Sequence, residues 1–296
     1  MLRIGLFLAT NVAILLLFGL VFQVLGLEQF LAAQGIHNDL TSLLIICGFF
    51  GFAGSFISLL LSKTLAKMGT RTQIITEPAN EQERWLVNTV AELAKKADIG
   101  MPEVGIFPAQ QSNAFATGWN KNKALVAVSA GLLTRFSPDE ARAVLAHEIG
   151  HVANGDMVTL TLIQGVVNTF VMFFARIIGS IIDKAVFKND RPGLGYFAIV
   201  MLLQFVLGIL ASTIVLAFSR WREYRADAAG AHLATRGAMI GALRRLQAET
   251  QAHVPGELPD TLTALGISSG WKEHATKLFM SHPPLEERIA ALQRGV

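Results

Sequence analysis

Four long apolar runs constrain this chain more than any other feature of its sequence. They cover residues 4–27, 40–62, 157–182 and 193–219, and three of them contain no charged residue. A helix of about 20 apolar residues spans the hydrocarbon core of a bilayer, so each run is long enough to cross it. The composition agrees, because 52% of the residues are hydrophobic, 16% are charged and the mean hydropathy is +0.46. We therefore expect a membrane protein.

The first run, residues 4–27, has two possible interpretations. A secretory signal peptide has an apolar core of about 7–15 residues and ends in a small-residue cleavage site. This run has 24 residues and ends in the sequence VLGLEQF. Its length and its end favour an uncleaved transmembrane helix.

Basic residues flank the first two runs on one side only. Arg3 precedes the first run, and Lys63, Lys67 and Arg71 follow the second, whereas the loop at 28–39 contains no Lys or Arg. Cytoplasmic flanks carry the excess of positive charge in membrane proteins. We therefore expect the N-terminus and the residues after the second run to lie in the cytoplasm.

The third and fourth runs form a candidate hydrophobic hairpin. The loop between them carries Lys184, Lys188 and Arg191, which argues mildly against an extracytoplasmic position. The hairpin therefore either spans the membrane twice or enters it and returns. Both alternatives bring the two ends of the hairpin to the same membrane surface.

The sequence between and after the runs has the pattern of soluble structure. Residues 81–98 follow the period of an amphipathic helix, and the segments 102–107, 113–118 and 124–129 are short and β-rich, with turn signals between them. We expect a small sheet from these segments. The stretch after residue 219 looks mostly helical, with a flexible loop at 256–269.

His147, Glu148 and His151 form the pattern H-E-x-x-H. On a helix the two histidines share one face, where one metal ion can bind both imidazoles. Glu148 projects about 100° away from His147, so its carboxylate can reach a catalytic water without binding the metal. The pattern predicts a zinc peptidase.

A separate signal indicates that this motif is helical. Ser137 is an expected N-cap, Pro138 suits the first helical position, and Glu140 completes the capping box S-x-x-E.

A catalytic zinc ion needs a third protein ligand and one open position. The three-histidine arrangement of the metzincins requires Gly at position 154 and His at 157, and this chain has Asn154 and Met157 instead. The other common ligand is a Glu on a separate helix. Glu223 and Asp227 share a helical face just after the fourth run, so Glu223 can bind the metal while Asp227 accepts the outer N–H of a ligating histidine.

The hydrophobic pattern brings these ligands together. His151 lies six residues before the third run and Glu223 four residues after the fourth. At 1.5 Å per helical residue they lie about 9 Å and about 6 Å from the membrane boundary. Both flank one hairpin, so they lie on the same side of the bilayer.

Four motifs then occur in one order along the chain: SNAFATG at 112–118, HEIGH continuing to NGD at 147–156, EYRAD at 223–227, and SHPPLEER at 281–288. With the apolar runs, these motifs make nearly the whole chain resemble the HtpX-type membrane zinc proteases of bacteria, in peptidase family M48. The resemblance implies a mainly α fold with membrane-embedded helices and a gluzincin-like α+β zinc peptidase domain that has a small β-sheet. It also implies one Zn²⁺ per subunit.

The resemblance assigns roles to single residues. The zinc ligands are His147, His151 and Glu223, the general base is Glu148, Asn113 holds the substrate backbone, His282 lies near the oxyanion, and Arg288 supports the site with Asp227.

The expected organisation has four parts. Two transmembrane helices occupy 1–62, a cytoplasmic peptidase part with the H-E-x-x-H helix occupies 63–156, the hydrophobic hairpin occupies 157–219, and a cytoplasmic helical part with the third ligand occupies 220–296. The implied activity is a metalloendopeptidase at the cytoplasmic face of the bacterial inner membrane. Its expected partners are the lipid bilayer and unfolded or damaged membrane proteins, and its expected role is quality control under stress.

Other functions fit the sequence less well. An intramembrane protease places its H-E-x-x-H within an apolar span, a scaffold with structural zinc usually has Cys ligands, and a transporter needs acidic or Lys side chains within its spans. The chain has one cysteine, Cys47. Its net charge of +3, with no Lys/Arg cluster interleaved with aromatic residues, argues against nucleic acid as a partner.

Individual site residues also have simpler interpretations. In these interpretations, Glu223 would pair with nearby arginines on an exposed surface, and Arg288 would pair with Glu286 or Glu287 on an exposed face. Asn113 would be an ordinary turn residue, and His282 would simply end a loop.

Overall fold

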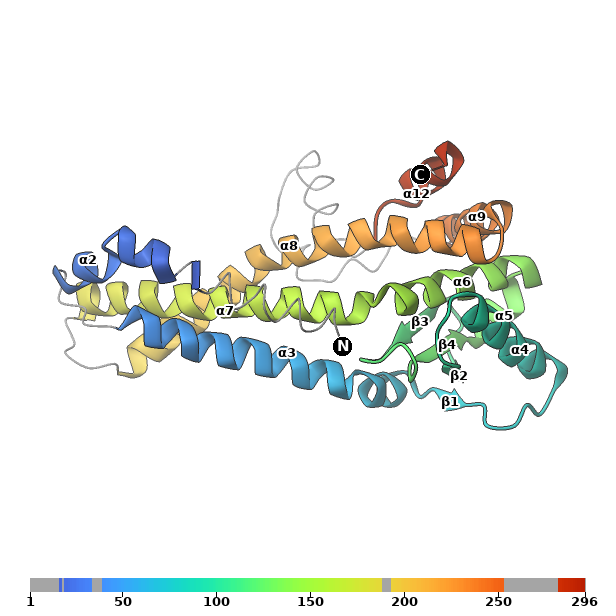
Figure 1. Ribbon diagram of the computed structural model, residues 1–296, viewed down its shortest axis with the longest axis horizontal. Coiled ribbons are helices and arrows are strands. Elements are labelled where there is room, and N and C mark those ends of the chain that lie inside the picture. Colours follow the sequence, from blue (N-terminus) through green and yellow to red (C-terminus); the bar gives the residue numbers. More distant parts are fainter. Residues whose placement is uncertain (1–15, 18, 34–38, 188–192, 253–281, 296) are drawn as a thin grey trace. The chain divides into compact units, whose positions relative to one another are not determined.

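The computed structural model describes residues 16–17, 19–33, 39–187, 193–252 and 282–295 (Figure 1). The chain forms two compact units. The first consists of residues 1–58 and 158–215, and the second of residues 59–157 and 216–296. Most of the first apolar run and the expected loop at 256–269 lie outside the described residues.

Three of the described helices are long and apolar enough to cross a membrane. They are α3 (Leu40–Thr70), the helix Asp156–Phe187, and α8 (Leu194–Leu233). The second of these consists of α7 (Asp156–Ile182) and a five-residue π-helix, Asp183–Phe187. The runs predicted at 40–62 and 157–182 fall inside these helices, and the run at 193–219 falls inside α8 from Leu194 onward. A short helix, α2 (Leu27–Ala33), precedes α3.

The second unit contains a four-stranded mixed sheet. Its strands are β1 (Gln73–Ile74), β2 (Glu103–Phe107), β3 (Ala114–Thr117) and β4 (Leu125–Ser129), in the order β1-β2-β4-β3. β2 and β4 are parallel, whereas β1 pairs antiparallel with β2 and β3 pairs antiparallel with β4. β2, β3 and β4 confirm the predicted sheet. β1 was not predicted, because a two-residue strand is too short to show a period.

Among the described residues, the second unit also contains α4 (Glu81–Lys96), α5 (Ala130–Arg135), α6 (Pro138–Asn154), α9 (Arg236–Ala252) and α12 (Leu285–Arg294). The amphipathic helix expected at 81–98 is α4, and the helix that carries H-E-x-x-H is α6. The expected fold class, mainly α with membrane helices and a small sheet, is confirmed.

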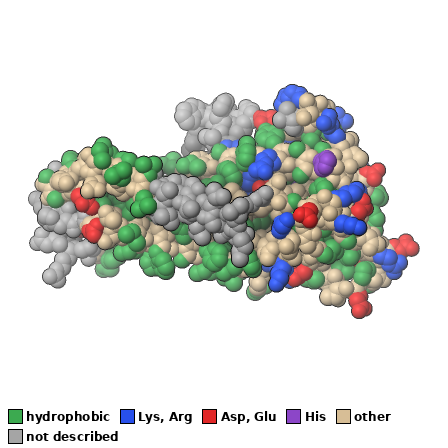
Figure 2. All heavy atoms as spheres, in the orientation of Figure 1, with side chains coloured by type: hydrophobic (Ala, Val, Ile, Leu, Met, Phe, Trp, Pro, Cys, Tyr) green, Lys and Arg blue, Asp and Glu red, His purple; other side chains and the backbone are tan. Residues whose placement is uncertain are grey.

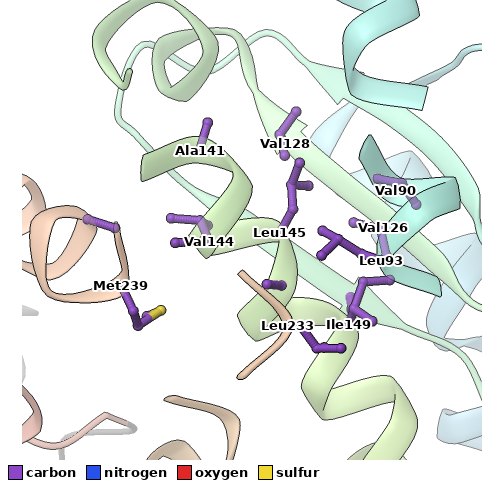
Figure 3. Close-up of a cluster of buried hydrophobic side chains, with 14 of the residues drawn as sticks. Val90, Leu93, Val126, Val128, Ala141, Val144, Leu145, Ile149, Leu233 and Met239 are labelled. Carbon is purple, nitrogen blue, oxygen red and sulfur yellow. The ribbon is translucent and has the colours of Figure 1, made fainter. Parts of the chain in front are cut away.

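The core of the second unit fixes α6 against the sheet. Leu145 and Ile149 of α6 are fully buried in one cluster with Val126 of β4 and Leu93 of α4 (Figure 3). Burying a side chain of this size stabilises the fold by about 1.5–3 kcal/mol. The apolar face of α6 is thus anchored in the core, which holds the helix of the histidine motif in place. Charged side chains gather mainly over this unit (Figure 2).

Both ends of α6 are set by local sequence. Ser137 and Glu140 form the predicted capping box, with Pro138 in the first turn. Gly155 ends the helix with φ +71°, a left-handed conformation that glycine adopts without strain. The chain therefore turns at once into α7 at Asp156.

Candidate metal centre

His147, His151 and Glu223 meet in the interior of the second unit. One possible ligand atom from each lies within 4.8 Å of the other two, and all three residues are buried. Nε2 of His147 lies 3.5 Å from Oε2 of Glu223, and Nε2 of His151 lies 3.4 Å from Oε1. Both histidines therefore turn the same ring nitrogen toward the carboxylate.

The site depends on a close approach of α6 and α8. A Cβ built on Gly150 of α6 lies 2.8 Å from Cβ of Ala229 on α8. A larger side chain at either position would push the helices apart. Gly150, the glycine inside HEIGH, thus lets Glu223 reach both histidines.

Each histidine has a second carboxylate at its other nitrogen. Asp227 Oδ1 lies 3.0 Å from Nδ1 of His147, although this contact does not have hydrogen-bond geometry. Asp156 Oδ2 forms a hydrogen bond of 2.7 Å with Nδ1 of His151. A proton on Nδ1 leaves the Nε2 lone pair free, and this is the tautomer that binds a metal through Nε2.

The carboxylates also control the charge of the rings in the metal-free protein. Burial lowers the pKa of His147, but Asp227 and Glu223 outweigh it and raise that pKa above its usual range. Burial likewise lowers the pKa of His151, but Asp156 and Glu223 outweigh it and raise the pKa to about 9. The site therefore favours positive charge, as a cation-binding site does.

Arg288 and His282 complete the cluster from the C-terminal part of the chain. Arg288 is buried and donates two hydrogen bonds to Asp227, of 2.8 and 2.6 Å. Burial lowers the pKa of Arg288, but the hydrogen bonds with Asp227 and the charges of Asp227, Glu223 and Glu148 together raise that pKa above its usual value. Nδ1 of His282 lies 2.7 Å from Oε2 of Glu223, and the His282 side chain is 60% exposed.

Glu148 and Asn113 are the other two expected site residues. Glu148 is half-buried on α6 and interacts electrostatically with His151 and Arg288. Asn113 directly precedes β3, and its backbone pairs with Ser129 at the end of β4. β3 is an edge strand of the described sheet and contacts α6.

Two of the simpler interpretations do not hold in the structure. Glu223 is 2% exposed, so it is not a surface acid. Arg288 is buried against Asp227 and does not form an exposed pair with Glu286 or Glu287.

Sequence reasoning missed two residues at this site. Asp156 ends the motif NGD and contacts His151, although the sequence suggested no role for it. Arg222 is buried, and its Nη1 donates to the backbone carbonyl of Asp156 at 3.0 Å. The sequence did contain a signal for Asp156, because this acidic residue directly precedes an apolar run and follows the candidate ligand His151 by five residues.

The donor set suits zinc. Two imidazole nitrogens and one carboxylate oxygen are the protein ligands of a His₂Glu catalytic zinc site, which leaves one position open. A structural zinc site is closed by four ligands and is usually rich in cysteine. The sole cysteine, Cys47, lies on α3 in the first unit.

Comparison with known proteins gives a consistent result. The family model described as peptidase family M48 matches residues 80–296. Protease HtpX of Hahella chejuensis is 65% identical over 293 residues, and Protease HtpX of Ectopseudomonas mendocina is 63% identical over 295 residues. Each alignment covers 99% of both chains. The crystal structure of Ste24p from S. mikatae shares the fold, with a TM-score of 0.61 and 18% identity, over 99% of this chain and 67% of that one.

Proposed function

The chain belongs to peptidase family M48 and is a membrane metalloprotease, and on this premise we propose that His147, His151 and Glu223 hold a catalytic zinc ion. The observation that carries the proposal is the convergence of the three ligand atoms within 4.8 Å, with a carboxylate behind each histidine. Zinc in such a site polarises a peptide carbonyl and lowers the pKa of a water to about 7.

Glu148 is the general base of the proposed reaction. It follows His147 on α6 and is half-buried, so its carboxylate is partly open to solvent and substrate. It takes a proton from the attacking water and delivers it to the leaving amine. Its carboxylate interacts electrostatically with His151 and Arg288.

His282 donates to the oxyanion that develops on the substrate. Its contact with Glu223 brings the ring to the ligands, and its exposure leaves it accessible to a bound peptide. A donor placed before the reaction stabilises the transition state without reorganisation.

The substrate binds as an extended strand along β3. This strand is at the edge of the described sheet, and it contacts the helix that carries the histidine motif. Backbone hydrogen bonds along such an edge give affinity with little sequence selectivity. Asn113, which directly precedes β3, holds the substrate backbone. Low selectivity suits an endopeptidase that removes misfolded or damaged membrane proteins during stress.

The active site faces the cytoplasm from the bacterial inner membrane. Arg3, Lys63, Lys67 and Arg71 support this orientation through the positive-inside rule. α6 is not among the candidate spans in the described part of the chain, so the motif does not resemble that of an intramembrane protease.

Proteolysis of an unfolded substrate tests the proposal. Full-length protein in detergent, loaded with zinc, should cleave casein, and Glu148→Gln should retain zinc but lose about 10²–10⁴-fold in rate. A variant that binds zinc and cleaves as well as the wild type removes Glu148 as the base. A wild-type protein that holds zinc and cleaves no protein favours a scaffold.

A further inference from the structure

Asp156 is a buried acid at the first position of α7, and its carboxylate faces the metal centre. It is 3% exposed, and it forms the 2.7 Å hydrogen bond with Nδ1 of His151. Gly155 ends α6 in a left-handed conformation, and Asp156 follows it directly, five residues after His151.

A second helix holds Asp156 in position. Arg222 of α8 donates Nη1 to the backbone carbonyl of Asp156 at 3.0 Å, and it donates Nη2 to Oγ of Ser219 at 3.1 Å. Arg222 is itself 6% exposed and directly precedes Glu223. One turn of α8 therefore supplies the third proposed ligand and also restrains the residue behind the second histidine.

The two carboxylates behind the histidines differ in their surroundings. Asp227 accepts two hydrogen bonds from Arg288, and its contact with His147 does not have hydrogen-bond geometry. Asp156 forms a 2.7 Å hydrogen bond with His151. Burying a carboxylate is unfavourable unless the carboxylate is paired. The hydrogen bond with the imidazole of His151 provides this pairing for Asp156.

We propose that Asp156 is the positioning residue of His151, holding the proton on Nδ1 so that Nε2 is presented to the metal. This inference rests on the proposed zinc site. The carboxylate fixes the ring orientation and raises the basicity of the ligand nitrogen, and loss of such a partner typically lowers metal affinity by about 10–100-fold. Asp156 thereby links the zinc ligands to the start of the membrane helix α7.

A purely structural role has to be separated from this one. An acid in the first turn of a helix also stabilises the helix dipole. Asparagine has nearly the volume of aspartate and caps helices equally well, but it carries no charge. Asp156→Asn therefore tests the charge behind His151, and Asp156→Ala removes the contact entirely. Asp139→Asn is the matched control, because Asp139 is an exposed acid in the first turn of α6.

The experiment titrates metal-free, full-length protein in detergent with Zn²⁺ against a chromophoric chelator. We expect wild-type affinity in Asp139→Asn, about tenfold weaker binding in Asp156→Asn, and up to about 100-fold weaker binding in Asp156→Ala. The visible spectrum of the Co²⁺-loaded protein should change in Asp156→Asn. The metal-free Asp156→Asn protein should still unfold in a cooperative thermal transition.

The outcomes distinguish this inference from the proposed function. Wild-type Zn²⁺ affinity and an unchanged Co²⁺ spectrum in Asp156→Asn would overturn the positioning role, even if Asp156→Ala fails to fold. Weaker zinc binding by an Asp156→Asn protein that shows no cooperative thermal transition would also overturn it, because the loss would then come from unfolding. A wild-type protein that binds no Zn²⁺ would instead overturn the zinc site itself.

Discussion

Arg288 and Asp227 form a buried two-point contact behind the metal centre, in which Nε and Nη2 of the guanidinium donate to the two carboxylate oxygens at 2.8 and 2.6 Å. This contact joins α12 to α8 over a separation of 61 residues. Because Asp227 also lies 3.0 Å from Nδ1 of His147, the C-terminal helix takes part in holding the site.

Arg288→Met leaves Asp227 buried without its cation, which should destabilise the protein by about 3–5 kcal/mol. Arg288→Lys should recover only part of this loss, because a lysine cannot donate two parallel hydrogen bonds. Denaturant unfolding in detergent measures both, with the exposed Arg294→Met on the same helix as control. Wild-type stability in Arg288→Met would contradict the prediction.

Removal of Glu223 should abolish stable zinc binding. Glu223→Ala leaves two histidines, and a site with two protein ligands binds zinc far more weakly than one with three. After dialysis, metal analysis should find little zinc in Glu223→Ala and full occupancy in the control Glu77→Ala, which changes an exposed acid. Full zinc in Glu223→Ala removes Glu223 from the ligand set.

Gly150→Ala should damage the site although alanine favours helices. Alanine at an open helical position stabilises by about 1 kcal/mol over glycine. At Gly150 the new methyl group would lie 2.8 Å from Cβ of Ala229, and such overpacking costs about 1–3 kcal/mol. We expect a lower thermal midpoint and weaker zinc binding. Gly237→Ala is the control, because a Cβ there has open space, and equal behaviour of the two variants would refute the close approach.

His282→Gln should lower the rate and leave zinc in place. Loss of one oxyanion donor typically lowers kcat by about 10²–10³-fold. The exposed ring contributes little to the core, so the thermal midpoint should stay unchanged. Steady-state cleavage with zinc analysis of the same sample measures the effect. Loss of zinc together with activity would show that His282 supports the ligands instead.

The pair of Glu92 and Arg142 predicts a pH dependence of stability. Hydrogen bonds from Arg142, with a contact to Lys96, lower the pKa of Glu92 to about 2. In the unfolded chain this pKa is about 4.3. The folded state therefore gains stability from Glu92 above pH 4.3 and loses it as the pH falls toward 2.

Denaturant unfolding of the metal-free protein at a series of pH values checks this. Glu92→Gln should be less stable than the wild type at pH 7, and the difference should close between pH 4.3 and 2. The exposed Glu81→Gln on the same helix is the control. A difference that is constant with pH would mean that the charge of Glu92 has no part in it.

Local features of the sequence were sufficient to predict most of the helices and strands. Long apolar runs give membrane-length helices because backbone groups in lipid must bond within the segment. The capping box at Ser137 predicted the start of α6 correctly, because it depends on two residues only three positions apart in the chain. The spacing of His147 and His151 placed both on one helical face for the same reason.

Contacts between elements were decided only by the tertiary structure. Whether Arg288 faces solvent or Asp227, and whether Arg222 pairs with Glu223 or bonds to the carbonyl of Asp156, depends on how α6, α8 and α12 pack. That packing depends on side-chain volumes at single points such as Gly150, which no periodicity reveals. The sequence by itself determined which residues are able to bind a metal. The fold decided which carboxylate lies behind each histidine, because that choice depends on distances between segments far apart in the chain.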